Sequence, residues 1–213
     1  MQQVLLFGDS LSWGIIPDTR QRFEFEQRWP GVAEGLLIQS GYTVRIIEDC
    51  LNGRRTVLDD PFKPGRNGLN GIQQRIEINA PLRLVIIMLG NNDFQSPHLF
   101  TATEAAQGVA ALVHSIRLAP IEPGMPIPAI LLVSPPPITA PKGAIAAKFR
   151  GAADKWCGFN NALEQVAEQL DCHFFDAAQV TTASRVDGIH LDLEQHQALG
   201  EALATVIAPL LRK

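Results

Sequence analysis

The chain has 213 residues, of which 46% are hydrophobic and 19% are charged, so it holds enough apolar material for a folded core. Its 18 basic and 22 acidic residues give a net charge of −4, and no block of Lys and Arg stands out, which argues against nucleic-acid binding. This length is typical of a single α/β domain, and we expect one domain over residues 1–213.

No segment is typical of export or membrane insertion. The apolar run at residues 4–8 is much shorter than the hydrophobic region of a signal peptide, and the uncharged stretch 123–141 holds seven prolines. The three cysteines form no C-x-x-C pair, which favours free thiols over a disulfide framework or a zinc site. We therefore expect a soluble, cytoplasmic protein that needs no metal and no cofactor and does not bind a membrane.

Five short apolar runs recur along the chain, and their starts are separated by 40, 41, 45 and 43 residues. Aliphatic residues occupy alternate and intervening positions alike, which is typical of strands buried on both faces. The separation fits a strand, a crossover helix and two loops, so the pattern predicts a parallel sheet. The runs are Gln3–Phe7, Thr43–Ile47, Leu84–Leu89, Ala129–Val133 and Cys172–Phe175.

Helical patterns lie between these runs. Thr101 and Glu104 are compatible with a capping box at the start of one helix, and Asp192 can cap the last helix. The spacing of apolar residues predicts helices over 71–79, 101–116, 147–170 and 192–210, and segments 15–30, 59–71 and 134–146 are expected to be surface loops. The alternation of strands and helices predicts one doubly wound α/β domain.

Four polar clusters follow strands of the predicted sheet. In an open parallel sheet, ligands bind beyond the carboxyl ends of the strands, so these clusters are expected to meet at one edge. They are Gly8-Asp9-Ser10-Leu11-Ser12-Trp13-Gly14, Asn52-Gly53-Arg54-Arg55, Gly90-Asn91-Asn92-Asp93 and Asp187-Gly188-Ile189-His190.

These clusters contain the parts of a serine nucleophile. A serine hydroxyl needs a base to take its proton, and the base needs an orienting partner. Of the five histidines, only His190 has an acidic residue three positions earlier, Asp187. We predict Ser10 as nucleophile, His190 as base and Asp187 as its partner. For the oxyanion, the backbone N–H of Ser10, the backbone N–H of Gly53 and the side-chain amide of Asn92 are candidate donors.

Each cluster also has a simpler interpretation. Ser10 can be an N-cap, Asp187 and His190 can be turn and surface residues, and 91–93 can be an ordinary turn. Their coincidence at one sheet edge favours the catalytic interpretation. Trp13, Phe94 and Ile189 flank the clusters and are candidate pocket walls, although core packing explains them equally well. Arg54 and Arg55 are expected to be solvated or to form an interfacial salt bridge.

The four clusters resemble the four sequence blocks of the SGNH (GDSL) hydrolase superfamily, in the same order and over nearly the whole chain. The resemblance implies a flavodoxin-like three-layer α/β/α domain with a five-stranded parallel sheet. It also implies the same catalytic residues, Ser10, Asp187 and His190, and an oxyanion hole formed by Ser10, Gly53 and Asn92.

Within that superfamily, the chain is most similar to a subgroup of small bacterial arylesterases and acyltransferases (perhydrolases). Trp13-Gly14, the strand 85–90 and Val133-Ser-Pro-Pro-Pro137 carry this similarity. Asn91 stands where the subgroup usually has Thr, which implies an altered substrate preference or acyl-transfer efficiency. The similarity further implies a homo-oligomer, as large as an octamer.

We therefore predict a serine esterase that acts on small-molecule short-chain acyl or aryl esters, with a carbohydrate O-acetyl esterase as the alternative. A nucleotide- or phosphate-binding flavodoxin-like module is a rival from another class, but no G-x-x-x-x-G-K-[ST] and no strand-linked G-x-G-x-x-G is present. A metallohydrolase using Asp187, His190, Asp192 and His196 lacks an H-E-x-x-H motif, and an ordinary α/β-hydrolase lacks G-x-S-x-G around Ser10.

Overall fold

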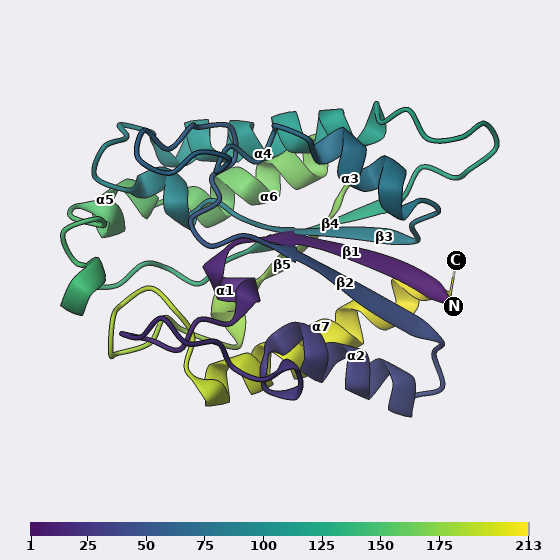
Figure 1. Cartoon of the computed structure of the whole chain (residues 1–213), viewed down its shortest axis with the longest axis horizontal. Coiled ribbons are helices and arrows are strands. Elements are labelled where there is room, and N and C mark those ends of the chain that lie inside the picture. The colour runs from purple at the N-terminus through teal and green to yellow at the C-terminus, as the bar shows by residue number, and fades with distance from the viewer. Residues whose placement is uncertain (213) are drawn as a thin grey trace.

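Five parallel strands form one central sheet in a computed structural model that describes residues 1–212 (Figure 1). The strand order is β2-β1-β3-β4-β5. This sheet confirms the predicted five-stranded α/β fold, and each strand starts within a residue or two of its predicted position. The strands are β1 (Gln2–Gly8), β2 (Val44–Cys50), β3 (Leu84–Met88), β4 (Ala129–Ser134) and β5 (His173–Asp176).

Helices cover both faces of the sheet, so the molecule has three layers (Figure 1). On one face α2 packs against α7, and on the other α4 packs against α3 and α6. The helices are α1 (Ser10–Trp13), α2 (Trp29–Gln39), α3 (Ile72–Asn79), α4 (Ala102–Arg117), α5 (Ala152–Trp156), α6 (Phe159–Gln169) and α7 (Leu193–Leu211).

The central strand β1 supplies side chains to both apolar cores. Leu5 and Phe7 join the core under α3, α4 and α6, whereas Val4 and Leu6 join the core under α2 and α7. Successive side chains of a strand point to opposite faces, which explains why the sequence of β1 is apolar without alternation. Each fully buried aliphatic side chain stabilises the fold by roughly 1.5–3 kcal/mol, so the strand ends are held on a rigid frame.

The helices differ from the predictions in two places. The segment 15–30, predicted as a surface loop, ends in the first turn of α2, where Trp29 is fully buried. The predicted helix 147–170 is divided into α5 and α6, because Gly158 between them adopts a left-handed conformation with φ of 88°. The capping box of Thr101 and Glu104 is confirmed at the start of α4.

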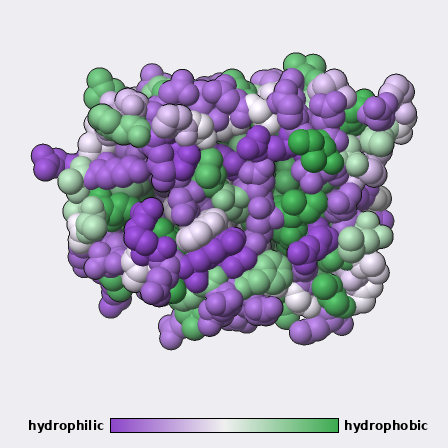
Figure 2. All heavy atoms as spheres, viewed as in Figure 1, coloured by the Kyte–Doolittle hydropathy of each residue, from purple (hydrophilic) through white to green (hydrophobic). Residues whose placement is uncertain are grey.

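The surface seen in Figure 2 is mainly hydrophilic, and hydrophobic residues occur on it in scattered groups. Within residues 1–212, no helix combines the length and the apolar character that crossing a membrane requires.

Candidate active site

Ser10 lies at the point where β1 ends and α1 begins. Asp9 caps this short helix, because its Oδ1 accepts a hydrogen bond of 2.9 Å from the backbone N–H of Leu11. The helix ends after one turn at Gly14. This tight turn holds the Ser10 side chain at the carboxyl edge of the sheet, where the residue keeps 8% of its surface exposed.

Ser10 meets the two residues that the sequence pairs with it. Its Oγ lies 3.1 Å from Nε2 of His190, and Nδ1 of His190 lies 2.6 Å from Oδ2 of Asp187. Ser10 is 180 residues away from His190 in the sequence. A hydroxyl, an imidazole and a carboxylate in this order form the arrangement that activates a serine oxygen for attack on an acyl carbon.

Asp187 is fixed by its own turn. Its Oδ1 accepts hydrogen bonds of 2.9 Å from the backbone N–H groups of Ile189 and His190. Burial opposes ionisation of this carboxyl, but the hydrogen bonds and the nearby imidazole outweigh burial and lower its pKa to about 2. The carboxylate is therefore ionised at neutral pH and holds the imidazole with Nε2 toward Ser10.

Two backbone N–H groups at the site have no internal partner. Among residues 1–212, the amides of Ser10 and Gly53 donate to no protein acceptor. Gly53 has φ of 83°, a left-handed conformation that favours glycine. Together with Asn92, both residues line a hollow of about 60 Å³, which we call the serine hollow; its other walls include Lys148, Phe149 and His190. Free donors around a nucleophile are what an oxyanion requires.

A buried chain of hydrogen bonds orients the Asn92 amide. Arg55 Nη2 donates to Gln95 Oε1 at 2.5 Å, Gln95 Nε2 donates to Asn92 Oδ1 at 2.5 Å, and Asn92 Nδ2 donates to Asp9 Oδ2 at 2.8 Å. An arginine only donates and an ionised carboxylate only accepts, so both ends of the chain impose the same direction. One hydrogen of Asn92 Nδ2 is left for the serine hollow.

The carboxylate at the end of this chain is deeply buried. Burial raises the pKa of Asp9 to about 6, although the hydrogen bonds from Leu11 and Asn92 and the charges of His190 and Arg54 lower it in part. At neutral pH Asp9 is therefore mostly ionised and able to accept from Asn92.

Asp93 links the two loops that supply Gly53 and Asn92. Its carboxyl accepts from the backbone N–H of Thr56 at 3.1 and 3.2 Å and from Thr56 Oγ1 at 2.5 Å. The Thr56 side chain packs so closely on α4 that a Cβ at Gly108 would collide with it. Burial raises the pKa of Asp93 to about 7. These contacts fix the spacing between the loops that carry the candidate oxyanion donors.

Trp13, a predicted wall residue, and Asn91, predicted to alter substrate preference, have their contacts elsewhere. Trp13 is partly buried and lies under the Arg22 guanidinium, whose Cζ is 4.8 Å from the ring centroid. Asn91 is 2% exposed, and its Oδ1 accepts a 2.9 Å hydrogen bond from Trp156 Nε1, so it ties α5 to the turn after β3. Neither side chain lines the serine hollow.

Phe94 and Ile189 belong to the apolar core instead of the pocket. Phe94 is fully buried and makes an edge-to-face contact with Phe159, with ring centroids 5.4 Å apart. Ile189 is 2% exposed and reaches the site only through the backbone N–H that it donates to Asp187. Both side chains therefore lie in the apolar core, as the core-packing alternative predicts.

Most residues that line the hollows around the base lie in loops for which the sequence predicts no function. A second hollow of about 280 Å³ adjoins the base, and we call it the histidine hollow. Asp187 and His190 lie in the loop before α7, and the other residues of this hollow lie in the loops after α1 and β4. These two loops follow strands at the carboxyl edge, and that position is the only signal that could have found their residues. The residues that line the histidine hollow include Asp187, His190, Ile15, Ile145, Arg20 and Lys148.

Arg54 and Arg55 are not on the surface. Arg54 is 3% exposed and its Nη2 lies 2.6 Å from Oδ1 of Asp49, and Arg55 is 1% exposed and its Nη1 lies 2.8 Å from Oδ2 of Asp60. The expectation of a solvated or interfacial pair is therefore wrong. Both arginines form ion pairs within the chain, because the loop after β2 folds back over the sheet edge.

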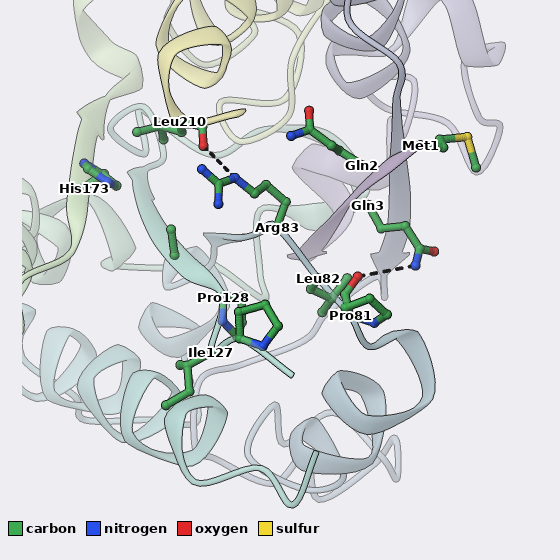
Figure 3. Close-up of a pocket in the computed structure, with 12 residues that line it drawn as sticks. Met1, Gln2, Gln3, Pro81, Leu82, Arg83, Ile127, Pro128, His173 and Leu210 are labelled. Atoms are coloured by element: carbon green, nitrogen blue, oxygen red, sulfur yellow. Dashed lines mark hydrogen bonds between the residues drawn. The ribbon is translucent and has the colours of Figure 1, made fainter. Parts of the chain in front are cut away.

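Another hollow, of about 470 Å³, lies at the opposite, amino edge of the sheet (Figure 3). Two of the polar side chains that line it form hydrogen bonds within the chain: Arg83 Nε donates to the carbonyl of Leu210, and Gln3 Nε2 donates to the carbonyl of Pro81. None of the predicted catalytic residues lines it. Its larger volume is therefore no reason to place the active site there.

The four residues considered for a metallohydrolase are separated by their contacts. Asp187 is bonded to His190, whereas Asp192 caps α7 and accepts from Ser184 Oγ at 2.8 Å. His196 Nδ1 accepts from the backbone N–H of Trp29. Across residues 1–212, no three His, Cys, Asp or Glu side chains gather into a set that could hold a metal ion.

Comparison with known proteins identifies the family of the chain. Residues 6–198 match the GDSL-like lipase/acylhydrolase family. The chain belongs to this family. No curated protein matched the sequence. Among solved structures, an inhibitor-bound aryl esterase of M. smegmatis is 33% identical with a TM-score of 0.93, and a carbohydrate acetylesterase from Sinorhizobium meliloti is 35% identical with a TM-score of 0.92. Each similarity covers 99% of this chain and 100% of the other.

Proposed function

We propose that this GDSL-family protein, a carboxylic ester hydrolase, cleaves short-chain acyl esters through an acyl-enzyme on Ser10. The observation that carries the proposal is the contact of 3.1 Å between Ser10 Oγ and His190 Nε2, with Nδ1 of the same imidazole 2.6 Å from Asp187. The free N–H groups of Ser10 and Gly53 and the oriented amide of Asn92 support it.

In the first half-reaction, His190 takes the Ser10 proton while Oγ forms a bond to the ester carbonyl carbon. The carbonyl oxygen becomes an oxyanion, which accepts hydrogen bonds from the three donors around the serine hollow. The bond from the carbon to the alcohol oxygen then breaks, and His190 gives its proton to the departing alkoxide. An acyl-Ser10 ester and a free alcohol remain.

In the second half-reaction, a water molecule takes the place of the alcohol. His190 removes a proton from this water, whose oxygen bonds to the acyl carbon, and the same donors hold the new oxyanion. Cleavage of the bond to Ser10 Oγ releases a carboxylic acid, and the proton returns to the serine. An alcohol or a peroxide in the position of the water gives acyl transfer or perhydrolysis, which we include in the proposal.

The size of the serine hollow supports a short acyl group. At about 60 Å³ it holds roughly two water molecules, the volume of an acetyl group rather than a fatty acyl chain. Aryl esters and O-acetylated carbohydrates are the two alcohol classes to test, because the similar structures include an aryl esterase and a carbohydrate acetylesterase.

Labelling and mutation of Ser10 test the proposal together. A fluorophosphonate is expected to modify one peptide, residues around Ser10, and Ser10→Ala is expected to abolish the labelling. The same variant is expected to lower kcat for 4-nitrophenyl acetate by about 10⁶-fold, as loss of a serine nucleophile does elsewhere. Ser12→Ala is the matched control, since Ser12 is fully buried two residues away and its Oγ faces Met88. Activity retained without Ser10 would reject the mechanism.

We also propose that the protein forms a homo-oligomer in the cytoplasm. The similarity to the arylesterase subgroup supports an assembly. Large apolar side chains such as Phe62 and Leu99, which are 87% and 90% exposed, would be buried in an interface between subunits. The cysteines at 50, 157 and 172 are free, which suits a reducing compartment. Light scattering on the purified protein measures the assembly, and a monomeric mass would refute it.

A further inference from the structure

Three cations surround the mouth of the serine hollow. Arg20, Lys63 and Lys148 all line it, and they come from three different loops. All three residues are exposed, and none forms an ion pair within residues 1–212. The chain as a whole carries a net charge of −4, so this concentration of positive charge does not reflect the overall composition.

One of these cations lies beside the predicted oxyanion hole. A Cβ built on Gly53 would lie 3.9 Å from Nζ of Lys148. Partial burial of its stem and the positive charges of Arg55, Lys63 and Arg20 lower the pKa of Lys148, and the carboxylate of Asp60 offsets part of this effect. The cations are therefore close enough to repel one another, and a bound anion would relieve that repulsion.

The acidic groups nearby cancel part of this charge. Asp187 keeps its negative charge but is buried, with its Oδ2 turned toward His190, and Asp60 forms an ion pair with Arg55. Asp18 lines the histidine hollow and supplies one opposing charge. Three lining cations therefore face two lining carboxylates around the two hollows, which leaves an excess of one positive charge. Low-dielectric walls strengthen the effect of that charge on a charged ligand.

The position of His190 shows which part of an ester meets the cations. His190 gives its proton to the leaving alkoxide, so the alcohol portion must lie on the side of this imidazole. The histidine hollow adjoins it, and at about 280 Å³ it is the larger of the two. Arg20 and Lys148 line this hollow as well as the serine hollow.

We propose that the preferred substrates are esters whose alcohol portion carries a carboxylate, bound in the histidine hollow by Arg20 and Lys148. The inference rests on the proposed esterase function. Ile15 and Ile145 supply apolar contacts beside the two cations, so the expected alcohol has a small apolar body and one negative charge.

Two esters of equal size test this preference. The probes are 4-acetoxybenzoate, which is anionic, and 4-acetoxybenzamide, which is neutral, and their alkaline hydrolysis rates correct for intrinsic reactivity. The corrected kcat/KM is expected to be higher for the anionic ester, and added salt is expected to lower this advantage because it screens exposed charges.

Variants assign the preference to the cations. Arg20→Gln and Lys148→Gln are each expected to lower the anionic-to-neutral ratio of kcat/KM by about two- to fivefold, the size of an exposed ion pair. The double variant is expected to lower it by about tenfold. Arg150→Gln removes the same charge from an exposed residue that lines neither hollow and is expected to leave the ratio unchanged.

The outcomes separate the two proposals. If the protein hydrolyses neither ester, the esterase proposal fails. If it hydrolyses both and the ratio is the same in Arg20→Gln, Lys148→Gln and the unmodified protein, the preference for an anionic alcohol is overturned while the esterase function stands.

Discussion

Two buried carboxylates lie on opposite sides of Ser10 and behave differently. Asp187 and Asp9 are each 1% exposed, yet the pKa of Asp187 is lowered to about 2 and that of Asp9 is raised to about 6. Asp187 accepts from three backbone N–H groups and from an imidazole, whereas Asp9 accepts from one N–H and one neutral amide. Asp187 also lies beside the histidine hollow, so burial penalises its charge less than that of Asp9. Donors, neighbouring charge and depth of burial together set the charge state.

The two sides also have different tasks. The side of Asp187 opens to the histidine hollow. In the proposed mechanism a proton moves there between Ser10, His190 and the alcohol. On the side of Asp9, a buried chain of hydrogen bonds runs back to Arg55, and no proton is transferred along it in the proposed mechanism. Its task is to hold the Asn92 amide in one orientation, and changes on the two sides are expected to differ in size.

The largest effect is expected on the proton-transfer side. Asp187→Asn replaces a carboxylate by an amide that no longer fixes the imidazole tautomer, so kcat for 4-nitrophenyl acetate is expected to fall by about 10⁴-fold with the fold intact. Asp171→Asn is a matched control, because Asp171 is exposed and its φ of 47° is one that Asn tolerates. A loss below tenfold would remove Asp187 from the mechanism.

A smaller effect is expected on the static side. Gln95→Glu keeps the shape of the side chain and its contact with Arg55, but the new carboxylate cannot donate to Asn92 Oδ1. The Asn92 amide is then expected to turn over and present its oxygen to the serine hollow. We expect kcat to fall by about 10²-fold, the low end of the range for a lost oxyanion donor, while the melting temperature does not decrease.

A double-mutant cycle distinguishes positioning from general damage. Asn92→Ala alone is expected to lower kcat by about 10²–10³-fold. If Gln95 acts through Asn92, adding Gln95→Glu to that variant changes kcat no further. Gln107→Glu, at an exposed position on α4, controls for the added charge. Independent, additive losses would show that Gln95 does not position Asn92.

The proton-transfer side was the more predictable from sequence. Ser10, Asp187 and His190 were identifiable because each follows a strand or its loop, and the carboxyl ends of parallel strands must meet. The interval of about 40 residues between apolar runs likewise predicts a parallel sheet from local pattern alone. In both cases the information lies in neighbouring residues.

The static side depends on contacts that no local pattern records. Gln95 and Arg55 are 40 residues apart and matter only because their side chains touch. The same limit explains Phe94: it follows Asn92 by two residues in a 3₁₀ turn, Asn91–Phe94, whose successive side chains point in different directions, so one faces the hollow and the other the core. Lys148 could not be found because the sequence assigns it to the start of the predicted helix 147–170, whereas it lies in the turn before α5.

The smallest expected effect is on the pH dependence of stability. It arises because burial raises the pKa values of Asp9 and Asp93, whereas that of Asp187 is lowered. The pKa of Asp93 is about 7 in the folded protein, against about 3.9 in an unfolded chain. Between these values the folded state keeps a proton that the unfolded state releases, so the free energy of unfolding falls as pH rises. Asp9 acts in the same direction up to about pH 6, whereas Asp187 acts in the opposite direction only near pH 2–4.

Urea unfolding at pH 5 and pH 8 measures this loss, and Asp93→Asn is expected to reduce it by about 2 kcal/mol, a factor of roughly 30 in the unfolding equilibrium. The amide resembles the protonated carboxyl and cannot ionise, so the variant keeps its stability at pH 8. His196, whose pKa burial lowers to about 3, also contributes between pH 5 and 6.5, but it is present in both proteins and cancels from the difference. An equal loss in Asp93→Asn and the unmodified protein would mean that Asp93 is already ionised at pH 5 and that its hydrogen bonds from Thr56 outweigh burial, as those of Asp187 do.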